Sequence, residues 1–381
     1  MNIKALSGSD FKKSISILLK EMLGQIGWLT GWDVTSTDAH EGQHCDLTVT
    51  IPKAEGSKAL LCVVCKNEFR PSQFSRLVEC SSLTKNINRD AVMVLAVPSI
   101  SVRVTELCEE HGWGWIDLAG NYRIDIPSLL HLECSGHPPV HNTPKPVANL
   151  STREACRVIR ALLSPENAGM RWTQRHLVEH FKLFEKPIPS PSLGLVNKIV
   201  RHLRDEAYIE ALSDSGFRVL EPQKLLVAWR DVYRFSRHKQ LKYFSLFNHK
   251  RILAALDELG MCERANVIYA SFSAAEYQAP NVRQPKIWLY IQEQNLAAFE
   301  HGVEAKQVDS GENLVVLIPD DESIFYQVDK GDDGPQSHLA CTNAVQTYVD
   351  LWNCGGRGKE AADAILEQCL RPMWLAKEIK K

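Results

Sequence analysis

The chain has 381 residues, of which 44% are hydrophobic and 24% charged, and its formal net charge is −2. These fractions are those of an ordinary soluble globular protein, and the length exceeds what one hydrophobic core organises, so we expect two or three domains. No apolar run reaches the ~18 residues of a membrane-spanning helix, the first residues lack the apolar centre of a signal peptide, and a cytoplasmic location is expected. The 11 cysteines are scattered, mostly through apolar runs, which argues against a disulfide scaffold.

The first domain is expected to be α/β and to cover residues 1–147. A helix is predicted at 11–24, and apolar runs predict strands at 47–51, 59–65 and 91–97. A helix after Ser101 and a strand pair in WGWIDL and YRIDI complete the unit. The segment SGHPPVHNTPKPVAN (135–149) has four prolines and no apolar periodicity, and therefore predicts a linker.

The run ALLCVVC (59–65) contains two cysteines at a spacing typical of zinc or thiol redox sites. Seven consecutive apolar residues predict a strand buried on both faces. Because side chains alternate along a strand, Cys62 and Cys65 are expected on opposite faces of the sheet. We therefore expect no metal or redox site at this pair.

The residues around this strand resemble the restriction-endonuclease-like fold of the PD-(D/E)XK superfamily. That resemblance implies an Asp on one strand, here Asp46, and a Lys at the end of the next, here Lys66, with Gln73 at the following helix start. The acid expected two positions before the lysine is replaced by Val64, which offers no oxygen ligand to Mg²⁺. Glu68 is the alternative acid. We expect a degenerate, inactive domain with no cofactor; Mg²⁺ enters only if the domain is an active nuclease.

The middle segment carries the basic charge of the chain. Residues 151–251 contain 19 Lys and Arg against 10 Asp and Glu, an excess of nine positive charges. Such an excess favours a polyanionic partner. In STREACRVIRALLS, a Ser or Thr cap precedes a helix with Ala155, Val158, Ile159 and Leu162 on one face.

A second helix is predicted after Thr173, and SLGLVNKIVRHLRDEAYI predicts a third. Its apolar face is expected to hold Leu193, Val196, Ile199, Val200 and Leu203. Two short strands follow around Ser-Asp-Ser-Gly, in which the glycine suits a left-handed position. Three helices and a hairpin in this order predict a winged helix-turn-helix at 148–222.

A recognition helix needs small residues where it enters the groove and long hydrogen-bond donors behind them. The residues that we expect to contact double-stranded DNA are Thr173, Gln174, Arg175, Ser190, Ser192, Gly194, Asn197, Lys198, Arg201, Arg204 and, on the wing, Arg218. A solvated amphipathic helix is the alternative explanation of the basic face.

The remainder, residues 223–381, is predicted to be a C-terminal α/β domain with a strand in NLVVLIP and helices in NAVQTYVDLW and GKEAADAILEQCL. The stretch WRDVYRFSRHKQLKYFSLFNHK interleaves aromatic and basic residues and is interpreted either as a nucleic-acid clamp or as an amphipathic helix with a basic outer face. Three further candidate phosphate contacts are Arg234, Arg237 and Lys239.

Several other motifs have simpler explanations. The acidic cluster Asp320 to Glu322 is interpreted as a solvated turn after a buried strand. CGGRGKE is interpreted as a helix connection rather than a phosphate loop. His176 and His180 are expected on the outer face of a short helix. No metal site is expected among these groups.

Five blocks occur in an order that resembles bacterial regulators of the AbiEi type, the antitoxin side of type IV toxin-antitoxin systems. They are AVMVLAVPSISVRVTELCEEHGWGWIDLAGNYRID (91–125), PSLGLVNKIVRHLRDEAYI, PQKLLVAWRDVY, LVVLIPDDESIFY and AVQTYVDLWNCGGRGKEAADAILE. The resemblance implies a transcriptional regulator that binds DNA through the winged helix, and a C-terminal domain that contributes to autoregulation or toxin neutralisation.

The hypothesis from sequence is thus a DNA-binding transcriptional regulator, with double-stranded DNA and a toxin or other protein as partners and a homodimer left open. Two alternatives remain. One is a Mg²⁺-dependent endonuclease targeted by its winged helix, and the other is an interaction protein whose basic segment meets an acidic partner.

Overall fold

A computed structural model of the chain describes residues 7–36, 45–53, 57–85, 91–140, 148–183, 189–213, 215–261, 267–330 and 339–378. Two compact units are distinguished, residues 1–145 and 146–381. The first contains a seven-stranded sheet, and the second a five-stranded and a two-stranded sheet. The mixed α/β character expected from the sequence is confirmed. No helix within the described ranges is long and apolar enough to cross a membrane. The linker predicted at 135–149 lies partly outside these ranges.

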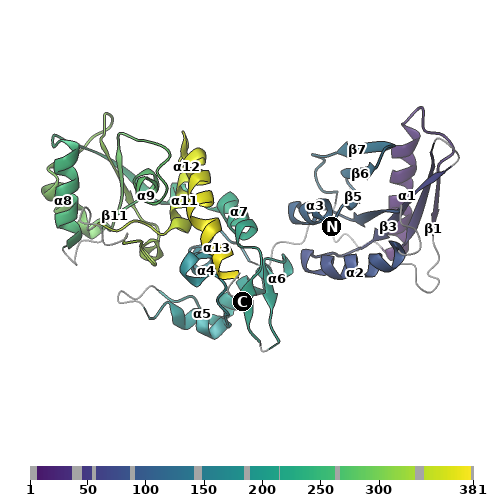
Figure 1. Ribbon diagram of the computed structural model, residues 1–381, viewed down its shortest axis with the longest axis horizontal. Helices are drawn as coiled ribbons and strands as arrows, with labels where there is room; N and C mark the ends of the chain where they lie inside the picture. The colour runs from purple at the N-terminus through teal and green to yellow at the C-terminus, as the bar shows by residue number, and fades with distance from the viewer. Residues whose placement is uncertain are drawn as a thin grey trace, which may run out of the picture. The chain divides into compact units, whose positions relative to one another are not determined.

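The first unit is an α/β layer structure. Its elements are α1 (Gly8–Gly24), β1 (Asp33–Ser36), β2 (Leu47–Pro52), β3 (Lys58–Cys65), η2 (Pro71–Gln73), α2 (Phe74–Lys85), β4 (Ala91–Val97), α3 (Val102–Glu110), β5 (Gly114–Asp117), β6 (Tyr122–Ile126) and β7 (Leu130–Cys134). The strands lie in chain order, with β3, β4 and β5 parallel and the other neighbours antiparallel. Helix α1 covers one face of the sheet, and α2 and α3 cover the other (Figure 1).

Strand β3 is buried on both faces, as its continuous apolar run predicts. Cys62 and Val64 belong to the core on the α2 and α3 side, whereas Val63 and Cys65 pack on the α1 side. The prediction that Cys62 and Cys65 point to opposite faces is therefore confirmed. All the cysteines that the structure describes are free thiols.

The second unit begins with a helical segment that ends in a hairpin. Its elements are α4 (Arg153–Leu163), η3 (Pro165–Asn167), α5 (Gln174–His180), α6 (Leu193–Asp205), β8 (Ile209–Ala211) and β9 (Phe217–Val219). Thr152, Thr173 and Ser192 cap the three helices by accepting a hydrogen bond from a backbone N–H of the first turn. Trp172 and Phe217 exchange backbone hydrogen bonds of 2.8 Å, which adds a short third strand position to the hairpin.

The rest of this unit is α/β. It contains α7 (Pro222–Val232), η4 (Phe235–Arg237), β10 (Lys239–Ser245), α8 (His249–Met261), β11 (Val267–Tyr269), α9 (Ser271–Gln278), β12 (Ile287–Ile291), η5 (Glu293–Asn295), α10 (Leu296–Gly302), β13 (Ala305–Gln307), β14 (Leu314–Ile318), η6 (Glu322–Phe325), α11 (Ala344–Asn353), α12 (Gly358–Ile365), η7 (Leu366–Leu370) and α13 (Arg371–Glu378). The sheet order is β11-β12-β14-β10-β13, with β12 and β14 parallel and the other pairs antiparallel.

Three local predictions are wrong. Residues 239–245 form strand β10, not part of an amphipathic helix, because α7 ends at Val232 and the chain turns through η4. Leu193, expected on the buried face of α6, is 44% exposed because it occupies the first helical position, before the helix meets the core. In the described part of the turn between β8 and β9, Ser215 has a left-handed conformation, at φ 64°, whereas Gly216, expected in that position, does not.

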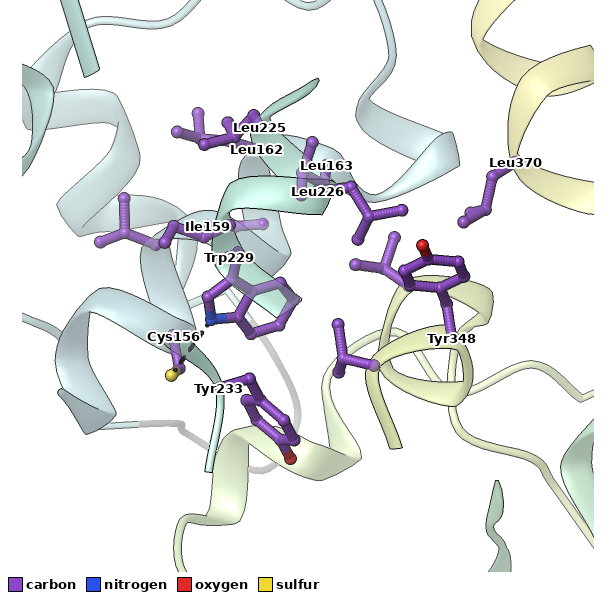
Figure 2. Packing of buried hydrophobic residues seen from close by; sticks show 14 of the residues in the cluster. Cys156, Ile159, Leu162, Leu163, Leu225, Leu226, Trp229, Tyr233, Tyr348 and Leu370 are labelled. Carbon is purple, nitrogen blue, oxygen red and sulfur yellow. Dashed lines mark hydrogen bonds between the residues drawn. The ribbon is translucent and has the colours of Figure 1, made fainter. Parts of the chain in front are cut away.

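One hydrophobic core joins the helical segment to the C-terminal helices. It contains Trp229 of α7, which packs among the apolar residues of α4, with Tyr348 of α11 and Leu370 of η7 on its far side (Figure 2). The indole Nε1–H of Trp229 donates to Cys156 Sγ of α4 at 3.4 Å. Buried side chains of α4 to α6 and of α11 to α13 belong to the same contact cluster, so these helices share one core.

Candidate nucleic-acid interface

The outer face of α6 is the most open basic surface among the residues predicted to contact DNA. Gly194, Asn197, Lys198 and Arg201 recur at helical spacing on this face, and all are exposed. In the part of the chain that the structure describes, neither Lys198 nor Arg201 forms an ion pair, and a Cβ added to Gly194 would meet nothing within 4 Å. Arg204 is exposed one turn further along. The opposite face of α6 is buried through Val196, Ile199, Val200 and Leu203.

The start of α5 lies against this face. Asn197 Nδ2 donates to Gln174 Oε1 at 3.2 Å, which brings the first residue of α5 to the middle of α6. Thr173 uses its hydroxyl to cap α5, accepting from the N–H of His176 at 3.1 Å, and Arg175 is exposed. The Ser192 hydroxyl likewise caps α6, accepting from the N–H of Leu195 at 3.3 Å, whereas Ser190 is half-buried in the preceding loop.

The other predicted contacts lie on different elements. Arg218 of β9 pairs with Glu210 of β8 across the hairpin. Arg237 donates to the carbonyl oxygen of Ser151, and Lys239 pairs with Glu293 at 3.2 Å. Arg234 is exposed at the start of η4. Of these basic residues, three thus have an internal partner.

Part of the basic excess is used inside the protein. On α4, Arg153 pairs with Asp320 at 2.5 Å and Arg157 pairs with Asp321, whose side chain is only 10% exposed. The guanidinium groups hold the pKa of both carboxyls below their usual range, although burial opposes this for Asp321. The prediction of a solvated acidic turn is therefore wrong. Arg157 also donates to the carbonyl oxygen of Pro189 at 2.8 Å, which ties the loop before α6 to the same cluster.

Beneath these ion pairs lies a buried polar network that the sequence analysis missed. Arg160 is 2% exposed and donates to Gln346 Oε1 through Nε at 2.9 Å and through the terminal nitrogen at 2.6 Å. Gln346 Nε2 in turn donates to Asp350 Oδ1 at 2.7 Å. The hydroxyls of Tyr233 and Tyr290 donate to the two oxygens of Asp350 at 3.0 and 2.9 Å. The network connects α4 to α11 and to the sheet.

His238 completes the network and has a fixed tautomer. Its Nδ1 accepts the backbone N–H of Asp320 at 3.0 Å, so the proton resides on Nε2, which lies 2.8 Å from the Tyr233 hydroxyl. Burial lowers the pKa of His238 to about 4. Burial also raises the pKa of the Asp350 carboxyl to about 7, against the donors that favour its charged form.

The two histidines of α5 also lie in a packed environment, so their predicted position on an outer face is wrong. The rings of His176 and His180 contact the buried ring of Trp172, with centroids 5.0 and 5.1 Å away. His180 Nε2 lies 2.6 Å from the hydroxyl of Tyr326, which also accepts from Asn167 Nδ2 at 2.8 Å. Helix α5 is thereby bonded to the segment that follows η6. The glycine connection between α11 and α12 is as predicted, with Gly355 and Gly356 at positive φ.

In the first unit, the carboxylate named by the nuclease resemblance is engaged in structural contacts. Asp46 Oδ1 pairs with Lys12 of α1 at 2.5 Å, and its Oδ2 accepts the backbone N–H of Cys65 at 2.8 Å. The hydrogen bond from Lys12 to Asp46, together with the charge of that carboxylate, raises the pKa of Lys12, against its burial. Val64 is 3% exposed and lies in the core on the α2 and α3 side.

Among the described residues, no hydrogen bond or ion pair joins Asp46 to the other residues of that resemblance. Lys66 and Glu68 are exposed after the end of β3, and Gln73 Oε1 accepts the backbone N–H of Arg70 at 2.9 Å. Within the described ranges, no group of three His, Cys, Asp or Glu residues is arranged to hold a metal ion.

The fold and this surface define a mixed α/β protein with an exposed basic helix face in its second unit. A family model described as "Transcriptional regulator, AbiEi antitoxin, Type IV TA system" matches residues 218–371, from within β9 to the first residue of α13. No curated protein and no solved structure matches the chain.

Proposed function

We propose that the protein is a transcriptional regulator that binds double-stranded DNA through a winged helix-turn-helix, with α6 as the recognition helix and the β8–β9 hairpin as the wing. The observation that carries the proposal is the outer face of α6. There Lys198 and Arg201 project from an otherwise packed helix without an internal partner among the described residues, beside the bare backbone of Gly194. Long donors beside a small residue meet the requirement for entering a major groove.

The family match supports the regulatory part of this proposal. Residues 218–371 match a family of transcriptional regulators and antitoxins, and this segment shares its core with α4 and is bonded to α5. We propose that the C-terminal part binds a protein partner, such as a toxin, while the basic helix face binds DNA. The alternative of an acidic protein partner for the basic segment is tested by the same measurement.

The test is duplex binding as a function of salt. The double variant Lys198→Ala with Arg201→Ala is compared with a control that removes two exposed charges elsewhere, Lys306→Ala with Lys330→Ala. Binding to a mixed-sequence duplex is followed by fluorescence anisotropy. If each residue neutralises one phosphate, the slope of log K against log salt falls by about 2 in the first variant and stays unchanged in the control. Equal slopes for both variants, or no salt-dependent binding by the wild type, would reject the proposal.

For the first unit, we propose a degenerate nuclease-like scaffold without catalysis. The support is that Asp46 is held by Lys12 and by the Cys65 N–H, while a buried valine occupies the position where the superfamily carries an acid. The test is incubation of the protein with plasmid DNA and Mg²⁺. Metal-dependent cleavage that Lys66→Ala abolishes would instead establish the endonuclease alternative.

A further inference from the structure

The side-chain contact between α5 and α6 lies on the face that we propose enters the DNA groove. Gln174 is the first residue of α5, and Asn197 lies on the outer face of α6 between Gly194 and Arg201. Asn197 Nδ2 donates to Gln174 Oε1 at 3.2 Å, although Asn197 itself is exposed. An exposed asparagine normally exchanges its hydrogen bonds with water, whereas this one has a protein partner that restricts its orientation.

The hydrogen-bonding capacity of the Asn197 amide is only partly used. A carboxamide carries two N–H donors and an oxygen with two lone pairs. Among the described residues, Gln174 is the hydrogen-bond partner of this amide; when it accepts from the N–H that points away from the amide oxygen, the other N–H and the oxygen remain side by side for a ligand. An amide N–H and the amide oxygen on the same side can together make two parallel hydrogen bonds to one base, which is bidentate recognition.

This edge matches one base in the major groove. Adenine presents its N7 acceptor beside its N6–H donor, which is complementary to an amide N–H beside an amide oxygen. Guanine presents two acceptors, N7 and O6, so the amide oxygen would face another oxygen. The neighbouring Gly194, which has no side chain, leaves room for the backbone of α6 to approach the base pair.

We propose that Asn197 reads an adenine in the major groove and that Gln174 is the positioning residue that holds the Asn197 amide for it. This inference rests on the proposed function and deepens it, because it assigns the base that α6 selects at one position. Lys198 and Arg201 contribute through charge, whereas Asn197 contributes sequence discrimination without charge.

The experiment uses the full chain and one chemically altered base. The wild type selects its preferred duplex from a randomised pool. Each adenine of that duplex is then replaced singly by 7-deazaadenine, which lacks the N7 acceptor but keeps the base pair. At one adenine we expect the wild type to lose roughly threefold to tenfold in affinity, the effect of one neutral hydrogen bond. The Asn197→Ala variant is expected to bind the altered and unaltered duplexes equally.

Two further variants separate positioning from folding. Gln174→Ala should reduce the penalty at the same adenine, because its loss frees the Asn197 amide to rotate. Gln307→Ala removes an exposed amide on β13, outside the residues predicted to contact DNA, and should keep the wild-type penalty. A folding defect in a variant would lower affinity for both duplexes alike and leave their ratio unchanged, so the ratio reports the contact itself.

The outcomes distinguish this inference from the function beneath it. A selected duplex with no sensitive adenine, or a penalty that Asn197→Ala retains, would overturn the reading of adenine while leaving DNA binding intact. Salt-dependent binding without any selected sequence would do the same. If the wild type binds no duplex, both proposals fall together.

Discussion

Replacing Asp350 by asparagine should change how the stability of the second unit depends on pH. Asp350 is 0% exposed, and burial raises the pKa of its carboxyl from 3.8 to about 7. Because this pKa is raised on folding, the native state binds the proton more tightly than the unfolded chain. The stabilisation is therefore complete below pH 3.8 and is lost as pH rises through 7. The shift corresponds to about 4 kcal/mol in full, of which about 3 kcal/mol falls between pH 5 and pH 8.

Asparagine keeps the shape of the side chain and cannot ionise. Its amide oxygen can still accept from Gln346 and Tyr233, while the Tyr290 hydroxyl must rotate to accept from the amide nitrogen. The free energy of unfolding of Asp350→Asn minus that of wild type should therefore increase by about 3 kcal/mol between pH 5 and pH 8, so that the variant gains relative stability. Other titrating groups contribute equally to both proteins and cancel in this difference.

Hydrogen exchange of α11 peptides in increasing urea, followed by mass spectrometry, measures this quantity locally, so that the first unit does not interfere. A stability difference between the two proteins that stays constant from pH 5 to pH 8 would refute the reasoning, because it would mean that Asp350 keeps its charge at both values.

Three further changes test other contacts. His238→Gln should abolish a loss of stability that the wild type shows as pH falls from 6.5 towards 4, because the pKa of His238 is lowered to about 4 by folding; the same exchange assay reads this. Gly358→Ala would bring a Cβ to 2.1 Å from the Leu351 carbonyl oxygen and should force α12 away from α11, lowering the melting temperature, whereas the control Gly27→Ala, where an added Cβ meets nothing within 4 Å, should leave it nearly unchanged. Asp321→Ala should cost about 3–5 kcal/mol of unfolding free energy, because it leaves the Arg157 guanidinium, which is 12% exposed, without its carboxylate partner; replacing Arg157 as well should restore most of the loss.

The elements with the clearest periodicity could be predicted from the sequence. The alternating pattern of β2, the continuous apolar runs of β3 and β4 and the amphipathic pattern of α6 each predict which residues are buried, and these residues lie in the core. Alternation along a strand was sufficient to separate Cys62 from Cys65.

The contacts that sequence reasoning missed join residues far apart in the chain. Asp321 belongs to an acidic cluster that sequence reasoning interprets as a solvated turn. Its partner Arg157 lies 164 positions away in the chain, so the local sequence does not indicate the pairing. Two patterns in the sequence could have indicated these contacts. Arg153, Arg157 and Arg160 recur at helical spacing on α4, and Gln346 and Asp350 lie four residues apart among the mostly apolar buried residues of α11. Either pattern places polar groups where packing demands a partner.

At the candidate interface, the basic residues could be predicted from the sequence, but which of them already form an ion pair within the protein could not. Lys198 and Arg201 were recognised from charge and helical position, and both are open on the surface. Arg218 and Lys239 are equally basic in sequence but pair with Glu210 of β8 and Glu293 of η5, which the fold places beside them. Local sequence does not report which basic residue already has an acidic neighbour.

The shared core around Trp229 has a consequence for how this protein can be divided or recombined. The family match begins at Arg218, inside a strand whose hairpin partner lies before it, and the core continues from α4 to α13. A gene fusion that transplanted only the segment from α4 to β9 would leave behind the helices against which α4 packs. A replacement for the segment from α4 to β9 would therefore have to be inherited together with α7, α11 and the C-terminal helices, as a single unit.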